Sequence, residues 1–93
     1  MENKVQTNMI KYLRAKGCYV IKTKPQPGVP TGCPDIIFMS KKFWGAIECK
    51  SSEKAPWQPL QEETLTLMNN WSWAKKVHSG NLINTIAELE RIL

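Results

Sequence analysis

The sequence predicts a single α/β domain over residues 1–93, in which a mixed sheet of about four strands is flanked by helices in the order α-β-β-β-α-β-α. Apolar residues recur at helical spacing near both ends of the chain, and short β-branched and aromatic runs fill its middle. The sequence contains no internal repeat and no low-complexity tract. A chain of 93 residues buries roughly 60–65% of its unfolded surface, so we expect one domain of marginal stability.

The N-terminal segment, residues 2–16, has the pattern of an amphipathic helix, because Val5, Met9 and Leu13 recur at steps of four. On a helical wheel of about 100° per residue, Glu2 falls on the same face as Met9 and Leu13. We therefore expect Glu2 to point inward, not toward solvent.

Three strands are expected next. Residues 18–24 are rich in β-branched and aromatic side chains, and residues 35–39 and 43–50 are two further strand-forming runs. The segment 25–32 contains three prolines and two glycines and is predicted to be a loop. A short turn at residues 40–42 separates the last two runs, so we expect them to pair as a hairpin.

The C-terminal part is predicted to fold as a helix, a strand and a second helix. Pro59 is well placed as the first residue of one helix, residues 74–78 suit a strand, and Ser79 or Asn81 could cap the last helix. The predicted inner face of the first of these helices comprises Leu60, Thr64, Leu67, Met68 and Trp71, and that of the last comprises Leu82, Ile86, Leu89 and Leu93.

Charge and cysteine content narrow the class of protein. The formal net charge of +5 favours polyanions such as nucleic acid, although charge alone is a weak indication. The three cysteines lack the short spacings of a zinc site, so we expect reduced thiols, with Cys18 and Cys49 packed as small hydrophobic residues. With no signal peptide and no apolar run of about 18 residues, the sequence predicts a cytoplasmic protein without membrane contact.

The predicted hairpin places two carboxylates together. If its turn is centred between residues 41 and 42, Asp35 lies directly across from Glu48, with Cβ atoms about 5 Å apart. By strand alternation Lys50 projects from the same face as Glu48, whereas Cys49 points the opposite way. Two facing carboxylates repel each other unless a cation lies between them, and Mg²⁺ or Mn²⁺ suits such oxygen ligands.

This arrangement has the parts that phosphodiester hydrolysis requires. A bound metal ion activates water and neutralises charge on the phosphate, and Lys50 could orient the nucleophile or stabilise the pentavalent oxyanion. Pattern alone leaves a second interpretation open, in which Asp35 ends a turn and Glu48 and Lys50 form a solvated strand face.

Pro34-Asp35 followed by Glu48-Cys49-Lys50 resembles the P-D…(D/E)-x-K active-site pattern of the restriction-endonuclease-like superfamily. Within it the chain is similar to the VRR-NUC (virus-type replication-repair nuclease) family in its minimal stand-alone phage or bacterial form. The likeness covers nearly the whole chain, through the sequences Y-L-R-A-K-G, G-C-P-D, A-I-E-C-K and P-L-Q. It implies a restriction-endonuclease-like core and a single VRR-NUC-like nuclease domain.

The resemblance also implies roles for individual residues. Asp35 and Glu48 would bind the metal ion through their side chains, the Cys49 backbone carbonyl would add a ligand, and Lys50 would be the catalytic lysine. Gln61 corresponds to the family's glutamine on the helix after the core. Glu2 corresponds to its N-terminal acidic residue, which agrees with the inward direction predicted from the helical wheel.

We therefore expect a Mg²⁺- or Mn²⁺-dependent DNA endonuclease in phage replication or repair, selective for branched or flapped DNA such as a Holliday junction. The family likeness implies a homodimer, with the final helix and the tryptophans as candidate interface residues. The alternative is a non-catalytic nucleic-acid-binding module with the same fold. A phosphate-binding rim is predicted from five lysines around the hairpin and its loops: Lys22, Lys24, Lys41, Lys42 and Lys54.

Four further residues are explained by ordinary packing roles. Trp57, Trp71 and Trp73 are more often core or interface residues than platforms for stacking bases. His78 is more often a packing or edge residue than a general base. The sequence assigns none of them a role in the chemistry.

Overall fold

The structure, a computed structural model, describes the backbone of residues 2–93 and the side chains from Lys4 onward. Its elements follow the predicted order: α1 (Glu2–Ala15), β1 (Tyr19–Lys22), β2 (Ile36–Met39), β3 (Trp44–Cys49), α2 (Gln61–Trp71), β4 (Trp73–Val77) and α3 (Leu82–Ile92). No helix among the described residues is long and apolar enough to cross a membrane.

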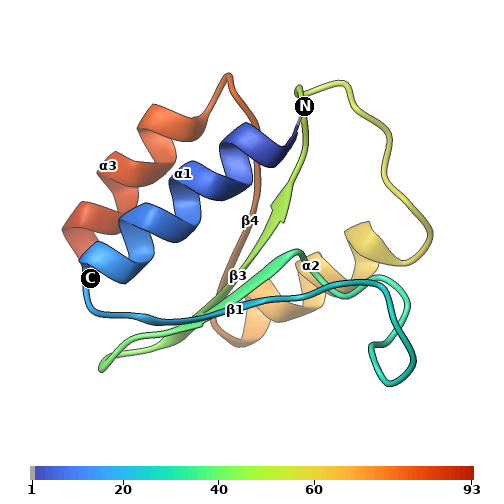
Figure 1. Ribbon diagram of the computed structural model, residues 1–93, viewed down its shortest axis with the longest axis horizontal. Helices are drawn as coiled ribbons and strands as arrows, with labels where there is room; N and C mark the ends of the chain where they lie inside the picture. Colours follow the sequence, from blue (N-terminus) through green and yellow to red (C-terminus); the bar gives the residue numbers. More distant parts are fainter. Residues whose placement is uncertain (1) are drawn as a thin grey trace.

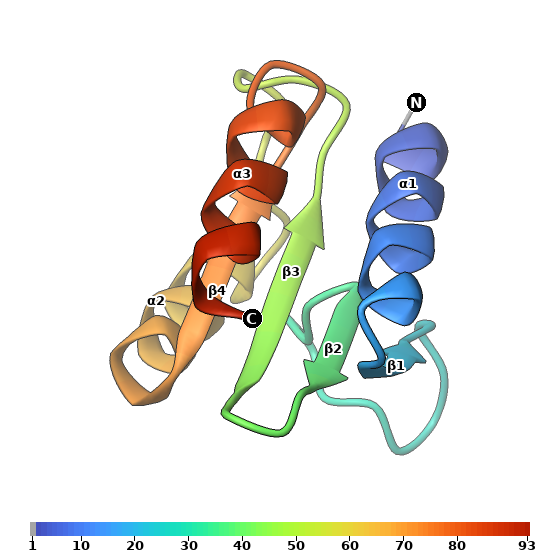
Figure 2. The same ribbon diagram turned by 90° about the vertical axis from the view of Figure 1, so that its left-hand side faces the viewer.

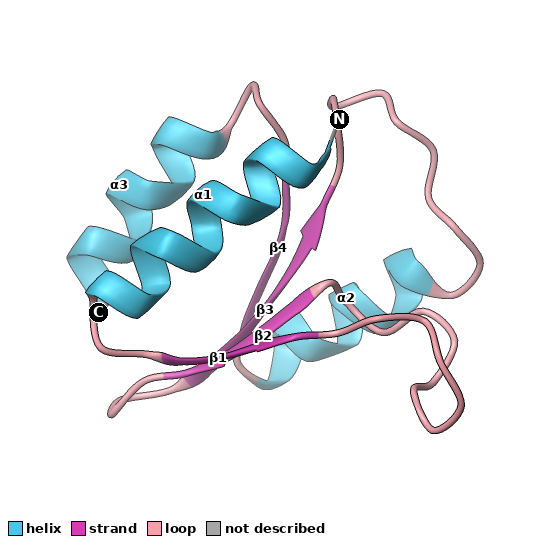
Figure 3. Ribbon diagram, viewed as in Figure 1, coloured by secondary structure: helices cyan, strands magenta, loops and turns pink. Residues whose placement is uncertain are grey.

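The strands form one mixed sheet in the order β1-β2-β3-β4. The neighbours β1 and β2, and β2 and β3, are antiparallel, whereas β3 and β4 are parallel and are joined through α2. Helices α1 and α3 lie side by side on one face of the sheet, and α2 covers the other face (Figures 1 and 3). Figure 2 shows the sheet between these two layers, so the predicted α/β fold is confirmed.

The larger part of the core lies between the sheet and the α1–α3 layer. Phe38, Ile47, Met9 and Leu89 are completely buried there. A smaller cluster on the α2 face consists of Ala46, Ala74 and Leu65, with partly buried residues around it. The small alanine side chains let α2 approach the sheet closely, because a helix can lie only as near as the side chains beneath it allow.

Strand alternation divides β3 between these two faces. Ile47 and Cys49 belong to the core under α1 and α3, whereas Ala46 belongs to the cluster under α2. The same period of two places Glu48 and Lys50 on the α2 face. The predicted hairpin register is confirmed, since Ile36 pairs with Ile47.

The predicted inner face of α2 was partly wrong. Thr64 and Met68 are half-buried as predicted, but Leu67 and Trp71 are exposed, and Leu65 is the residue that is buried. Leu60 precedes the helix in the left-handed conformation, with φ of 66°. The helix therefore begins two residues later than predicted, and the alanine cluster selects Leu65 as the residue that faces the sheet.

Element boundaries differ by one or two residues elsewhere. The first three strands are shorter than predicted, because Cys18, Asp35 and Lys50 lie just outside them, and β4 is displaced by one residue. Asn81 precedes α3 but makes no capping hydrogen bond; its side chain accepts a hydrogen bond from the backbone of His78 and donates one to the carbonyl of Lys76. Cys18 and Cys49 are buried, as predicted.

Gly45 is required by its contact with Phe38. A Cβ atom at position 45 would overlap the Phe38 ring, which is completely buried. We predict that Gly45→Ala lowers the free energy of unfolding by about 1–3 kcal/mol, as measured by urea denaturation. The double variant Gly45→Ala/Phe38→Leu should be more stable than the sum of the two single effects predicts; strict additivity would contradict this packing explanation.

Candidate active site

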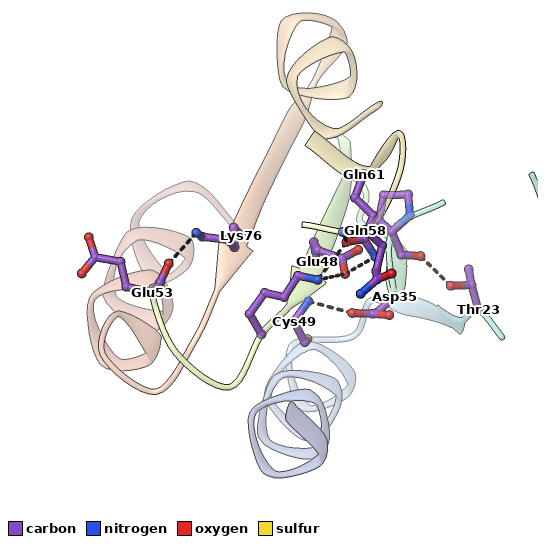
Figure 4. Close-up of polar contacts among 10 residues, drawn as sticks. Thr23, Asp35, Glu48, Cys49, Glu53, Gln58, Gln61 and Lys76 are labelled. Atoms are coloured by element: carbon purple, nitrogen blue, oxygen red, sulfur yellow. Dashed lines mark hydrogen bonds and ion pairs between the residues drawn. The ribbon is translucent and has the colours of Figure 1, made fainter. Parts of the chain in front are cut away.

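Four polar side chains converge on the α2 face, at the C-terminal end of β3 (Figure 4). Asp35 lies one residue before β2, Glu48 lies near the end of β3, Lys50 follows β3, and Gln61 begins α2. The sequence brings them together because the hairpin register sets Asp35 against Glu48, and because the crossover from β3 to β4 returns α2 over the same strand.

The backbone around Asp35 is held from both sides. Oδ2 of Asp35 accepts a hydrogen bond of 2.8 Å from the backbone N–H of Cys49. The hydroxyl of Thr23 donates to the carbonyl of Pro34 at 2.5 Å, and the N–H of Thr23 donates to the carbonyl of Asp35 at 2.9 Å. The end of β1 therefore fixes the entry into β2, which sets the position of the Asp35 carboxylate.

Gln61 joins the acid to the lysine. Its Nε2 donates to Oε2 of Glu48 at 2.8 Å, and its Oε1 accepts from Nζ of Lys50 at 2.8 Å. Oε1 also accepts from the backbone N–H of Gln58 at 2.7 Å, which orients the amide. Nζ of Lys50 lies 3.6 Å from Oε2 of Glu48, so one side-chain amide positions both charged groups.

Gln61 reaches this position because the 25–32 loop packs closely against the residue before α2. A Cβ atom at Gly32, which has φ of 86°, would lie 2.7 Å from backbone atoms of Leu60. The 25–32 loop can therefore pack against the start of α2 only with glycine at this position, since an L side chain would be both strained and too close.

Burial and, after it, the nearby Asp35 carboxylate raise the pKa of Glu48 to about 8, while Lys50 opposes the shift. Only 2% of Glu48 is exposed, and its Oε1 is buried with no hydrogen-bond partner among the described residues. A buried carboxylate oxygen without a partner is unfavourable, and it leaves one position open for a cation.

The donor set fits a hard divalent cation. Asp35 and Glu48 supply two carboxylates, and no group of three His, Cys, Asp or Glu side chains capable of holding a metal ion occurs within the described residues. Mg²⁺ is commonly held in this way, with water and substrate phosphate completing its coordination. Asp35 and Glu48 would hold the ion, and the Cys49 carbonyl stays a predicted third ligand.

The site opens onto a pocket of about 470 Å³. Asp35 and Gln61 line it together with residues of the loop after β1, including Thr23 and Lys24. A substrate group in this pocket would therefore contact Asp35 directly.

The structure separates the five lysines of the predicted rim. Lys24 lines the pocket, and Lys22 is exposed on β1. Lys54 is exposed on the loop between β3 and α2. Lys41 and Lys42 lie at the β2–β3 turn, at the other end of β3 from Glu48 and about 20 Å away along the strand. These two are therefore not brought together with the carboxylates.

Two other predicted residues lie apart from the cluster. The backbone of Glu2 begins α1, but its side chain lies outside the part of the chain whose side chains are described, so its role stays a prediction. His78 is buried at the end of β4, and its Nδ1 accepts a hydrogen bond of 3.1 Å from the N–H of Gly80. This contact agrees with a packing role for His78.

Two further residues border the site: Lys76, which the sequence did not single out, and Trp57, to which it assigned no role in the chemistry. Lys76 lies opposite Glu48 in the parallel pair of β3 and β4. Trp57 lies next to the ammonium groups of Lys50 and Lys76. Alternation along residues 74–78 was the only sequence signal for the position of Lys76. It does not reveal which residue of β3 lies opposite, because no short turn fixes the register of two parallel strands.

A mixed sheet that presents an aspartate, a glutamate and a lysine in this order is the arrangement of the PD-(D/E)xK nucleases. Residues 3–87 match the family model described as archaeal Holliday junction resolvase (Hjc), and the chain belongs to this family. No curated protein and no solved structure matches the chain.

Membership in this family confirms the nuclease class that the motifs predicted. Hjc resolvases are divalent-metal-dependent nucleases, and DNA is their substrate. This match does not confirm the narrower resemblance to VRR-NUC proteins.

The pKa of Glu48 predicts how stability depends on pH without divalent cations. Folded Glu48 holds a proton up to about pH 8, whereas the unfolded chain releases it near the ordinary value of 4.5. Between these values the folded state binds more protons, so the free energy of unfolding should fall as pH rises from 5 to 8.

Urea denaturation in EDTA at several pH values measures this effect. Glu48→Gln should flatten the profile, and the exposed Glu63→Gln should leave it unchanged. Adding Mg²⁺ or Mn²⁺ to the unsubstituted chain should stabilise it more at pH 8 than at pH 5, because the ion replaces the proton. A profile identical in Glu48→Gln would show that another group carries the dependence.

Proposed function

We propose that this chain is a Mg²⁺- or Mn²⁺-dependent endodeoxyribonuclease that hydrolyses phosphodiester bonds in branched DNA, with Holliday junctions or flaps as substrates. The observation that carries the proposal is the cluster of Asp35, Glu48 and Lys50, held by Gln61, with the buried Oε1 of Glu48 left open for a cation. Membership in the Holliday junction resolvase family supports the substrate class.

Each residue has a distinct task in the proposed reaction. Asp35 and Glu48 would hold the metal ion, which when bound lowers the pKa of water and neutralises charge on the phosphate. Lys50 donates hydrogen bonds as an ammonium and would stabilise the negative charge that develops on the phosphate oxygens. Gln61 keeps Nζ of Lys50 within 3.6 Å of Glu48, so the ammonium stays beside the metal position before substrate binds.

Branched DNA and phage replication or repair are the finer parts of the proposal. The net charge of +5 favours binding to the phosphate backbone whatever the base sequence, as a nuclease selective for DNA shape requires. The similarity of the motifs to minimal VRR-NUC nucleases supports a phage or bacterial setting. Lys24 lines the pocket and would contribute to the phosphate-binding surface. Lys22, at the end of β1, and Lys54, on the loop between β3 and α2, would add to it.

A cleavage assay on a labelled four-way junction and a linear duplex of the same sequence tests this function. With Mg²⁺ or Mn²⁺ we expect the junction to be cut faster than the duplex. Glu48→Ala should abolish cleavage, Lys50→Ala should slow it by about 10²–10³-fold, and Gln61→Ala by about 10–100-fold. Glu63→Ala, on the exposed side of α2, is the control and should cleave normally.

Binding of the junction without cleavage under either metal ion would indicate the alternative, a non-catalytic nucleic-acid-binding module. Cleavage that survives both Glu48→Ala and Lys50→Ala would place the activity elsewhere. Equal rates on junction and duplex would refute the selectivity for branched DNA while leaving the nuclease itself intact.

The proposal includes a homodimer, which would present two sites to the two strands of a junction. Helix α2 packs mainly on β3 and β4, and several apolar side chains on this side of the molecule are exposed. Leu67 and Trp71 extend outward from α2, while Tyr19 and Met39 are cross-strand partners on the part of the sheet beside it. Exposed apolar residues gathered on one face favour contact with a second copy.

We expect a dimer in sedimentation equilibrium and a shift to monomer in Trp71→Glu, because a buried carboxylate without a partner disfavours association. Ile83→Glu tests the other candidate interface, the final helix α3: Ile83 is 80% exposed there, and its substitution should leave a dimer formed through the α2 face intact. A monomeric unsubstituted chain at the concentrations used for cleavage would contradict the dimer, and equal dissociation by both substitutions would exclude this face as its interface.

A further inference from the structure

A second ammonium group, that of Lys76, lies next to the catalytic cluster on β4. Lys76 is opposite Glu48 in the parallel register, so its side chain leaves the sheet on the α2 face. Figure 4 shows that it extends toward Glu53, on the side away from Asp35. Lys76 therefore flanks the cluster and does not enter it.

The indole of Trp57 connects this group to the site. Nζ of Lys76 lies 5.1 Å from the centroid of the Trp57 ring, and Nζ of Lys50 lies 6.0 Å from the same centroid. Both distances are within the range of cation–π attraction, which holds an ammonium near an aromatic ring. Two positive charges are thus gathered around one half-buried side chain.

The charge of Lys76 is not neutralised by a carboxylate. None of the ion pairs among the described residues includes it, and its Nζ donates to the backbone carbonyl of Glu53 at 3.0 Å. The adjacent Lys75 differs, because it leaves β4 on the opposite face and pairs with Glu88 on α3 at 2.8 Å. Of the two neighbouring lysines, only Lys76 offers its charge on the side of the catalytic cluster.

There is also space for a ligand beside this ammonium. A pocket of about 290 Å³ is lined by Trp57, by Ala74, Lys75 and Lys76 of β4, and by residues of α2 that include Glu62. An ammonium at the edge of such a space, with a neutral carbonyl and an aromatic face as its contacts, is suited to an anionic group.

We propose that Lys76 binds a DNA phosphate on the strand being cut, a few nucleotides from the scissile one, and that Trp57 sets its spacing from Lys50. Successive phosphates of one strand are displaced by about 3.4 Å along the axis of B-DNA, so two ammonium groups around one indole can contact phosphates of the same strand. This inference rests on the proposed nuclease function. It extends the substrate path from the carboxylates across β4.

A purely structural role for Lys76 makes a different prediction. Its hydrogen bond to Glu53 would then hold the loop that carries Gln58, whose N–H orients Gln61. Loss of such a tether would disturb Gln61 and slow the chemical step. It would leave the number of phosphate contacts unchanged, and with it the salt dependence of binding.

The experiment measures junction binding by fluorescence anisotropy at several salt concentrations in the Glu48→Gln background, which retains the size of the side chain. Lys76→Ala, Lys76→Arg and Lys75→Ala are added in turn; the two alanine variants lose the same charge from adjacent positions. Single-turnover cleavage by the same three substitutions in the active chain, at saturating protein, measures the chemical step separately.

We expect Lys76→Ala to reduce the slope of log K against log salt by about 0.9 and to weaken binding severalfold, with the saturated cleavage rate unchanged. Lys76→Arg should restore the slope, and Lys75→Ala should not alter it. Equal slopes for the two alanine variants, or a loss confined to the saturated rate, would overturn the inference. Failure of the unsubstituted chain to cut any junction would instead refute the nuclease function, and the binding measurement would still decide the role of Lys76.

Discussion

The buried carboxylate of Glu48 faces a second carboxylate across the β2–β3 hairpin, and most of the site is arranged around this contact. Two facing carboxyl groups destabilise the folded state when both are ionised, unless their neighbours compensate. The N–H of Cys49 binds Asp35, while Gln61 and Lys50 bind one oxygen of Glu48. The other oxygen remains without a partner among the described residues. The fold therefore maintains a local deficit of positive charge, which a divalent cation would correct.

Placement of α2 determines whether this arrangement can form. Ala46 and Ala74 let the helix lie close to β3, and Leu65 fills the space that they leave. Gly32 allows the preceding loop to contact Leu60, which turns the chain into the helix through a left-handed conformation. Gln61 follows directly, with its amide between acid and lysine. A small error in helix position would break hydrogen bonds at both ends of that amide, so packing beneath α2 controls the geometry of the chemistry above it.

The local sequence pattern was sufficient to predict the β2–β3 hairpin, because the register of a hairpin depends only on its two strands and the turn between them. The period of two along 43–50 and a short turn fixed the hairpin, and these were sufficient to place Asp35 against Glu48. The face of α2 was predicted only in part, because Leu67 and Trp71 are apolar but exposed, whereas Leu65 is the residue buried against the sheet. Apolar character alone does not distinguish a buried face from an exposed one when the partner surface is unknown. The parallel register of β3 and β4, which brings Lys76 beside Glu48, depends on the whole crossover and could not be predicted from either strand.

Alternation in the sheet explains why so small a domain can combine a core with a charged site. The side chains of β2 and β3 that face α1 and α3 supply the completely buried residues, including Ile36, Phe38 and Ile47. The intervening positions face α2, where the layer is thin and the helix covers the sheet only in part. Stability thus comes mainly from one face, which leaves the other free to carry unfavourable charge. Because β4 continues the sheet in parallel to β3, the same alternation extends the charged face by one strand, from Glu48 to Lys76.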